Sequence, residues 1–357
     1  MLKAILVDDE PLFLDHFEKL LAEINDGIDV VGKYINPHQA LAAIFKEQPD
    51  VIFLDIEIPK LSGIEVAEKI QSSSLQTKFV FVTLYREYAV EAFELNAMDY
   101  LVKPVQQARL TKTIDRLSKD LHRHSMSKEP TREATLCFFR SIQFKCSGKG
   151  SKPLDVRWRT SKARELFAFL VHHRQKPVQK IDLIELLWPE TDGDKGMTQL
   201  YASIYQIRKT IASVGFNIHI TSHHDSYMLD LNGITFDVDV WEQRLSELST
   251  VSDDTLPRFQ ALIDMYPGDY LEEYDYLWAV GERERLRSLW LRCVMEVTDF
   301  MIAKGNYVEA LPFFHQVQER YPYMEDSYFN LIHLYDQLGD RYAVDQQYAK
   351  LEEMLGL

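Results

Sequence analysis

The first third of the chain alternates short apolar runs with segments of helical periodicity, and this alternation limits the folds open to it. Five runs are nearly continuous in apolar residues, as in parallel strands buried on both faces. They are Lys3–Val7, Asp29–Tyr34, Val51–Leu54, Phe79–Thr83 and Tyr100–Val102. Because helical patterns separate these runs, the segment predicts a doubly wound α/β domain with a five-stranded parallel sheet.

Polar side chains stand where the predicted strands end. Asp8 and Asp9 follow the first strand, Asp55 the third and Lys103 the fifth, and Thr83 closes the fourth. Each aspartate alone is also typical of a helix cap or a turn. However, the carboxyl ends of parallel strands meet at one edge of a sheet, so these side chains converge. Three carboxylates, a cation and a hydroxyl suit Mg²⁺ binding and in-line transfer of a phosphoryl group to a carboxylate.

The segment 1–118 resembles the receiver domain of bacterial response regulators, which has a flavodoxin-like fold. The matching motifs are Val-Asp-Asp-Glu at 7–10, Phe-Leu-Asp-Ile-Glu-Ile-Pro at 53–59, Gly63, and Asp-Tyr-Leu-Val-Lys-Pro at 99–104. The resemblance implies that Asp55 accepts phosphate from the phosphohistidine of a sensor histidine kinase.

The resemblance also implies roles for the residues around Asp55. Asp8, Asp9, Asp55 and the backbone carbonyl of Glu57 would ligate Mg²⁺. The residues that bind phosphate or switch would be Thr83, Tyr100, Lys103 and Pro104, with a cis peptide bond before Pro104. A departure is Leu84, where many receivers have a small residue, and we expect it to crowd access to Asp55. The following segment, with Tyr88, Ala92 and Phe93, is expected to form a signalling helix.

The charge of the chain is divided unevenly. The whole sequence carries a formal charge of −15, but residues 1–118 carry −7, residues 119–235 carry +6 and residues 236–357 carry −14. The middle third is therefore the part that a polyanion favours. Three cysteines without metal spacing indicate reduced thiols in a cytoplasmic protein. The acidic start predicts that the chain is not secreted, and the lack of any ~20-residue apolar run predicts that it is not inserted in a membrane.

The middle third predicts a polar linker at 119–133 and then a DNA-binding domain at 134–235. Strand-like runs at 134–139 and 142–146 precede helical patterns at 161–173, 180–188 and 197–214. Alternation across 215–231 then predicts a β-hairpin around His223-His-Asp-Ser226. Adjacent histidines in a turn point apart, so a wing tip in the minor groove is favoured over a metal site.

The third helix has a buried stripe and a polar face without acids. Its stripe is Leu200, Ile204, Ile207 and Ile211. The opposite side offers amides, hydroxyls and cations that can enter a major groove, although a solvated helix face is the commoner use of such residues. No Asp or Glu occurs between Met197 and Ser222, which supports DNA binding.

The segment 134–235 resembles the OmpR/PhoB-type winged helix. The supporting motifs are Trp158-Arg-Thr-Ser-Lys-Ala-Arg-Glu-Leu166, Leu186-Leu-Trp-Pro189, Ile207-Arg-Lys209 and Ser226-Tyr-Met-Leu229. We expect the DNA-contacting residues to be Thr198, Gln199, Ser203, Tyr205, Gln206, Arg208, Lys209, His223 and His224. Tyr205 and Gln206 stand where basic residues often occur, so we expect affinity to rely on dimers.

The last third, 236–357, reads as helices with an internal repeat. Gly305-Asn-Tyr-Val-Glu-Ala310 recurs as Gly339-Asp-Arg-Tyr-Ala-Val344 after 34 residues, the tetratricopeptide period. The block Tyr266–Trp278, with Glu282-Arg-Glu-Arg-Leu286, resembles the bacterial transcriptional activator domain of SARP-class regulators. That resemblance implies protein–protein contacts with a neighbouring protomer or RNA polymerase.

These observations favour a transcription factor of a two-component system, switched by phosphorylation of Asp55 and binding promoter DNA as a homodimer. The alternative is a regulator that acts mainly through protein contacts of its helical repeat, with weak or no DNA binding. An enzyme is disfavoured, because the sequence has no glycine-rich phosphate loop and no nucleophile elbow.

Overall fold

The computed structural model describes residues 2–24, 27–71, 73, 75, 77–85, 88, 92, 95, 97–126, 134–146, 152–223 and 225–356, without the side chains of 120–126, 194 and 223. The chain forms two compact units. One comprises Met1–Arg132 and Asp155–Ile234, and the other Glu133–Leu154 and Thr235–Leu357. The second unit is therefore assembled from two segments that are far apart in the sequence.

The N-terminal region contains the predicted five-stranded parallel sheet. Its strands are β1 (Leu2–Val7), β2 (Ile28–Tyr34), β3 (Val51–Leu54), β4 (Lys78–Thr83) and β5 (Asp99–Val102), in the order β2-β1-β3-β4-β5. The helices described between and after them are α1 (Pro11–Ile24), α2 (Pro37–Glu47), α3 (Gly63–Gln71) and α5 (Gln107–Met126). This topology is the flavodoxin-like receiver fold, which confirms the predicted fold class.

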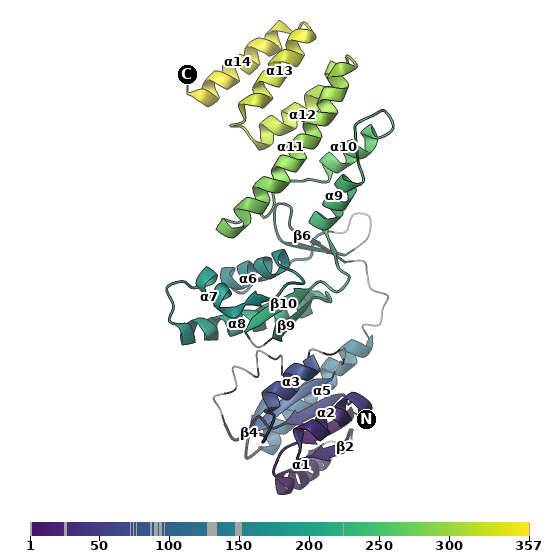
Figure 1. The fold of residues 1–357 in the computed structure, drawn as a ribbon, viewed down its shortest axis with the longest axis vertical. Coiled ribbons are helices and arrows are strands. Elements are labelled where there is room, and N and C mark those ends of the chain that lie inside the picture. The colour runs from purple at the N-terminus through teal and green to yellow at the C-terminus, as the bar shows by residue number, and fades with distance from the viewer. Residues whose placement is uncertain are drawn as a thin grey trace. The chain divides into compact units, whose positions relative to one another are not determined.

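Helices cover both faces of this sheet, which explains why its strands are largely apolar (Figure 1). On one face α2 and α3 pack through residues such as Ile44 and Val66 against Ile5, Ile52 and Phe81. On the other face α1 and α5 pack against the alternate strand residues, among them Leu6, Phe53 and Val82. Since neighbouring strand residues point to opposite faces, most positions of the central strands β1, β3 and β4 need an apolar side chain.

Residues 155–234 have the topology of a winged helix. The elements are α6 (Ser161–His172), β8 (Val178–Gln179), α7 (Lys180–Leu187), α8 (Gly193–Val214), β9 (His219–His223) and β10 (Ser226–Asp230). The three strands form an antiparallel sheet in the order β8-β10-β9, so the predicted hairpin is present. Helix α8 begins at Gly193 rather than at Met197, because the preceding Asp- and Gly-rich segment continues the helix.

The strands at 134–146 belong to the C-terminal unit. β6 (Ala134–Cys137) pairs with β7 (Gln143–Cys146) and with β11 (Thr235–Phe236), giving the order β11-β6-β7. Phe139 forms an isolated bridge with Tyr270, and Leu271 N donates to Phe138 O at 2.8 Å. These strands were expected to accompany the winged helix, whereas the structure joins them to helices that follow it.

The rest of the C-terminal unit is helical. Its elements are α9 (Asp237–Ser246), α10 (Leu256–Asp264), the 3₁₀ helix η1 (Leu277–Ala279), α11 (Val280–Ala303), α12 (Tyr307–Arg320), α13 (Glu325–Gln337) and α14 (Arg341–Leu355). Trp241, Trp290, Tyr266 and Phe259 are fully buried among them. In Figure 1 the last four helices stack as antiparallel pairs.

The 34-residue repeat is visible in the backbone. Gly305 and Gly339 each stand two residues after the last residue of α11 and α13, with φ values of 78° and 72°, a conformation that favours glycine. The closing hydrogen bonds recur with the same shift: Asn306 N donates to Met301 O at 2.9 Å, and Asp340 N to Tyr335 O at 3.0 Å.

Within the described ranges, no helix is both long enough and apolar enough to cross a membrane.

Candidate functional site: an acidic pocket and a recognition helix

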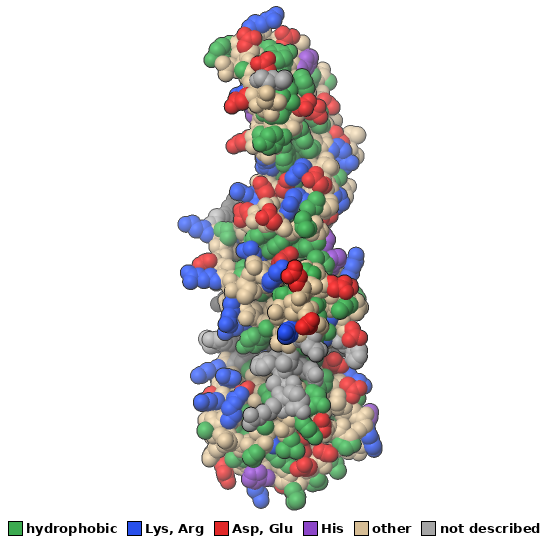
Figure 2. Space-filling model, turned by 90° about the vertical axis from the view of Figure 1, so that its left-hand side faces the viewer, with side chains coloured by type: hydrophobic (Ala, Val, Ile, Leu, Met, Phe, Trp, Pro, Cys, Tyr) green, Lys and Arg blue, Asp and Glu red, His purple; other side chains and the backbone are tan. Residues whose placement is uncertain are grey.

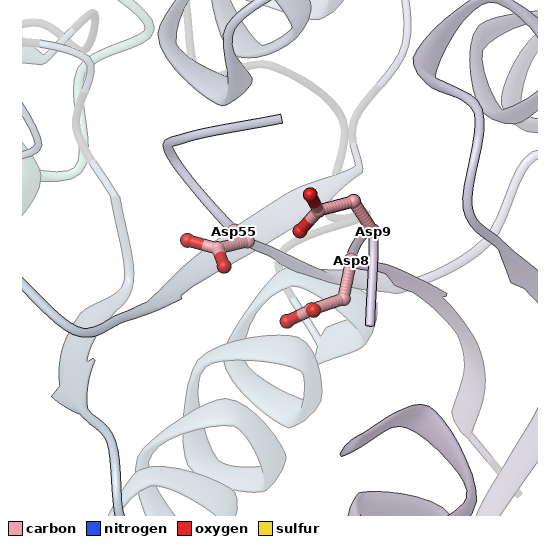
Figure 3. Close-up of side chains that lie close together, drawn as sticks. All are labelled: Asp8, Asp9 and Asp55. Carbon is pink, nitrogen blue, oxygen red and sulfur yellow. The ribbon is translucent and has the colours of Figure 1, made fainter. Parts of the chain in front are cut away.

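Three carboxylates meet at the carboxyl edge of the parallel sheet. Asp8 and Asp9 follow β1, Asp55 follows β3, and one oxygen of each lies within 4.8 Å of the others (Figure 3). Asp8 and Asp55 are only 2 % and 6 % exposed, whereas Asp9 is exposed. The sheet sets this arrangement, because β1 and β3 are parallel neighbours and Asp55 N donates to Val7 O at 2.9 Å.

Lys103 supplies the positive charge of the pocket. It follows β5, the peptide bond to Pro104 is cis as expected, and its side chain is 6 % exposed. Its Nζ lies 2.6 Å from Asp8 Oδ2 and donates to Asp55 Oδ2 at 2.7 Å. The ammonium therefore bridges the two buried carboxylates.

Burial sets the protonation balance in the pocket. Burial raises the pKa of Asp8 to about 6, against the lowering effect of Lys103 and of the hydrogen bond from Glu10 N. Burial lowers the pKa of Lys103, but hydrogen bonds and charge interactions with Asp55 and Asp8 outweigh it and raise that pKa overall. The lysine is thus fixed as a cation, and the site carries an excess of negative charge.

This donor set fits a hard divalent cation. Mg²⁺ prefers one or two carboxylates together with phosphate oxygens and water. Asp8 Oδ2 is buried and has Lys103 Nζ beside it at 2.6 Å, so this carboxylate already faces a cation. Asp9 and Asp55 offer further oxygens from the same edge. Asp8, Asp9 and Asp55 are therefore the side chains suited to hold Mg²⁺, and the backbone carbonyl of Glu57 stays a prediction.

Gly63 shapes the loop after Asp55. Gly63 N donates to Ile56 O at 2.8 Å, and a Cβ added at Gly63 would lie 1.9 Å from the backbone oxygen of Asp55. No side chain fits at that distance, so glycine is required for α3 to begin against the loop that carries Asp55.

Two of the predicted switch residues, Thr83 and Tyr100, stand on the neighbouring strands β4 and β5. Thr83 is fully buried at the end of β4, and Tyr100 is partly buried and donates from its hydroxyl to Tyr85 O at 2.6 Å. Tyr88, whose hydroxyl donates to Glu57 Oε1 at 3.2 Å, links the segment after β4 to the loop that follows Asp55. Phe93, predicted to lie on the signalling helix, falls outside the described residues.

Leu84, directly after β4, is 59 % exposed. The crowding of Asp55 that we expected from it stays a prediction.

Asp99 is a residue whose role sequence reasoning missed. Its buried carboxylate accepts hydrogen bonds from the guanidinium of Arg109 and from Thr113 Oγ1 (2.7 Å). This cluster ties β5 to α5 and so holds the strand that carries Lys103. The signal was present, because Asp99 opens the motif at 99–104 and Arg109 and Thr113 stand four residues apart on a helix.

The predicted DNA-contacting residues of α8 differ in how exposed they are. The buried stripe Leu200, Ile204, Ile207 and Ile211 is confirmed. Four predicted contacts, Thr198, Gln199, Tyr205 and Lys209, are exposed, and Gln206 is partly buried. These residues keep α8 as the candidate DNA-binding helix.

Two other predicted contacts require correction. Ser203 is 8 % exposed and lies on the inner side of α8. Arg208 is partly buried, and its guanidinium donates to Ile220 O at 2.8 Å, which fastens α8 to β9. Both contacts were expected from their positions in the resemblance to a winged helix, and a position in a motif does not fix how a side chain packs in this fold. The side chain of His223 and all of His224 lie outside the described residues.

The pocket and sheet define a class of protein, and comparison with known families agrees. Residues 4–115 match the response regulator receiver domain. The other end of the chain also matches a known family, since residues 242–356 match the bacterial transcriptional activator domain. This chain therefore carries a receiver domain at its start and an activator domain of the SARP type at its end.

Curated relatives share the receiver region. The chain is 46 % identical over 121 residues to an uncharacterized response regulatory protein of Vibrio cholerae, covering 34 % of this chain and 46 % of that protein. It is 39 % identical over 138 residues to the transcriptional regulatory protein BtsR of Escherichia coli K12, covering 39 % and 57 %. The chain thus spans about half the length of these relatives.

Among solved structures, the response regulatory domain of protein mrkE from Klebsiella pneumoniae is 34 % identical. The match covers 34 % of this chain and 98 % of that one, with a TM-score of 0.33.

Proposed function

We propose that this protein is a DNA-binding transcriptional regulator of a two-component system, controlled by phosphorylation of Asp55. The observation that carries the proposal is the buried Asp55 carboxylate held by Lys103 beside two further aspartates. We place the protein in the cytoplasm, where a sensor kinase and promoter DNA are both accessible to it.

In the proposed reaction, an oxygen of Asp55 attacks the phosphorus of a kinase phosphohistidine. The P–O bond forms while the P–N bond breaks, which leaves an acyl phosphate on Asp55. Lys103 is positioned to pair with a phosphoryl oxygen, and Thr83 offers a hydroxyl from the neighbouring strand. Bound Mg²⁺ supplies neutralising charge, and Asp8 and Asp9 would hold it.

The phosphoryl group would change the surface near β4 and β5. Its charge draws the hydroxyl of Thr83 toward Asp55, and Tyr100 then repacks beside it. The hydroxyl of Tyr100 already donates to the backbone oxygen of Tyr85, so its movement would shift the backbone at Tyr85. We propose that this change promotes a homodimer, which brings two α8 helices to spaced half-sites on DNA.

The proposed DNA contact uses the exposed side of α8. Gln199 offers an amide that can read adenine, and Lys209 can pair with phosphate. Tyr205 is 43 % exposed on the same helix and can contribute van der Waals contact to bases or sugars. With a single exposed cation among these residues, each monomer makes few phosphate contacts, so we expect the dimer to be the binding species.

Phosphorylation and promoter binding are tested together in the full-length protein. Acetyl phosphate with Mg²⁺ should label the wild type and raise its occupancy of promoter DNA in genome-wide mapping. Asp55→Asn should abolish both effects, whereas Asp115→Asn, a change on the exposed side of α5, should alter neither. Undiminished labelling of Asp55→Asn would reject Asp55 as the acceptor.

A second candidate function rests on the surface of the C-terminal helices. Figure 2 shows hydrophobic side chains in green at this surface, among acidic ones in red. Tyr323 and Tyr342 are 84 % and 75 % exposed, and Val308 is also exposed. Such aromatic groups are common anchors in protein interfaces.

In this second reading the activator domain binds a protein such as RNA polymerase, and DNA contact is weak. Gel shifts at several salt concentrations separate the two functions. Binding that is undetectable, or that does not respond to salt, favours the protein-contact function.

A further inference from the structure

An aromatic ring completes the surroundings of Lys103. Phe13 lies in the first turn of α1, and Lys103 Nζ sits over its ring, 4.2 Å from the centroid. The ring is itself held in place, because it stacks on Phe17 with centroids 5.4 Å apart, and Phe17 meets the edge of Phe53 at 5.2 Å. Phe53 is in β3, two residues before Asp55, so the three packed rings of Phe13, Phe17 and Phe53 connect α1 to the strand that precedes Asp55.

The ammonium of Lys103 is therefore contacted on several sides. It has three N–H groups, and two carboxylates, of Asp8 and Asp55, lie within 2.7 Å of the nitrogen. The face of Phe13 offers a further attraction that accepts no proton and does not compete as a metal ligand. Cation–π attraction is strongest where the cation is desolvated, and the Lys103 side chain is almost fully buried.

We propose that Phe13 is a positioning residue for phosphoryl transfer at Asp55. Its ring keeps the ammonium next to the carboxylates of Asp8 and Asp55. Lys103 can then donate to a phosphoryl oxygen instead of to Asp55 while its nitrogen stays in place. The ring also covers the α1 side of the ammonium against water. This inference rests on the proposed function of Asp55 as a phosphoryl acceptor.

A set of substitutions separates ring electrostatics from simple packing. Phe13→Leu removes the π face but keeps an apolar side chain, whereas Phe13→Tyr and Phe13→Trp keep the face. Phe45→Leu is the matched control, since it removes an exposed ring on α2, which packs on the opposite face of the sheet from α1. Thermal unfolding of each full-length variant establishes that it is folded.

The first measurement is the initial rate of Asp55 phosphorylation by acetyl phosphate at saturating Mg²⁺. We expect Phe13→Leu to lower the rate about tenfold, equivalent to about 1.4 kcal/mol. Phe13→Tyr and Phe13→Trp should stay within about twofold of the wild type, and so should Phe45→Leu. Equal rates for Phe13→Leu and the wild type, or an equal loss in Phe45→Leu, would overturn the inference.

The second measurement does not depend on phosphorylation. In protein labelled with ¹³C-lysine, the ε-methylene protons of Lys103 should be shifted upfield by the ring current of Phe13. Lys103→Arg assigns the resonance, which should lose its shift in Phe13→Leu and keep it in Phe13→Tyr. An unmoved resonance in Phe13→Leu refutes the contact. Failure of the wild type to accept phosphate, with the ring-current shift present, instead rejects the role of Asp55 and with it the role assigned to Phe13.

Discussion

The carboxylate of Asp237 accepts hydrogen bonds from the backbone N–H of Phe138 at 2.9 and 3.1 Å, although the two residues are 99 positions apart in the chain. Asp237 also accepts from Phe139 N at 3.2 Å and begins α9. One side chain therefore joins the end of β6 to the first helix of the C-terminal unit. The winged helix at 155–234 is, in sequence, an insertion between two parts of that unit.

Asp237 gives this unit a pH dependence. Burial raises the pKa of Asp237 to about 6, against the lowering effect of hydrogen bonds from the amides of Phe138 and Phe139. Between pH 4 and 6 the folded protein keeps a proton that the unfolded chain has lost, so the free energy of unfolding falls as the pH rises through this window. Asp237→Asn does not titrate, and its stability relative to the wild type should increase from pH 4.5 to pH 7.

The measurement is chemical unfolding of both proteins at several pH values. The comparison cancels the other titrating groups, such as Asp269, whose pKa is lowered by Arg287 and two tyrosines despite burial. The stabilisation from Asp269 is lost only below about pH 4. A constant difference between Asp237→Asn and the wild type across the window would contradict the prediction.

Lys103→Met should destabilise the receiver domain by about 3–5 kcal/mol, because it leaves two buried carboxylates facing each other without a cation. Mg²⁺ should restore a larger part of the stability in the variant than it adds to the wild type. Thermal unfolding with and without Mg²⁺ measures both effects. Lys46→Met, at an exposed lysine, is the control and should change stability by less than about 0.5 kcal/mol.

Gly63→Ala should lower the free energy of unfolding by about 3 kcal/mol and reduce phosphorylation, because the added Cβ would overlap the backbone oxygen of Asp55. Gly281→Ala in α11 has open space around the new Cβ and should be neutral or stabilise by up to about 1 kcal/mol. Equal effects of the two changes in chemical unfolding would argue against the tight contact at Gly63.

Gly305→Ala and Gly339→Ala should each lower the free energy of unfolding by about 1–2 kcal/mol, because both glycines adopt positive φ at equivalent points of the repeat. Asparagine tolerates this conformation better, so Gly305→Asn and Gly339→Asn should cost less than the alanines. Similar losses for Ala and Asn at both sites would show that backbone conformation does not set the cost.

Lys209→Ala and Arg208→Ala should weaken DNA binding in different ways. Lys209 is exposed on α8, so its loss should weaken binding to all sequences and reduce the salt slope by about one. Arg208 holds β9 through Ile220 O, so Arg208→Ala should lower the unfolding temperature and leave the salt slope unchanged. Gel shifts across salt, together with thermal unfolding, check both outcomes. An altered slope in Arg208→Ala would indicate a direct phosphate contact.

The N-terminal sheet and the helical repeat could both be predicted because their signals are periodic and local. A strand buried on both faces is largely apolar, and a polar residue directly after it lies at the sheet edge. For that reason Asp8, Asp55 and Lys103 could be brought together from sequence, and the spacing of Gly305 and Gly339 identified the repeat before the backbone showed it.

The sequence by itself thus determined the receiver fold, its acidic pocket and the 34-residue repeat. Only the tertiary structure decided which unit the strands at 134–146 join, because their partners Thr235, Asp237 and Tyr270 lie about 100 or more residues away. It also decided that Ser203 and Arg208 turn inward and that Phe13 covers Lys103. Such contacts depend on side-chain direction and on packing between distant segments, and neither produces a periodic pattern of residues in the sequence.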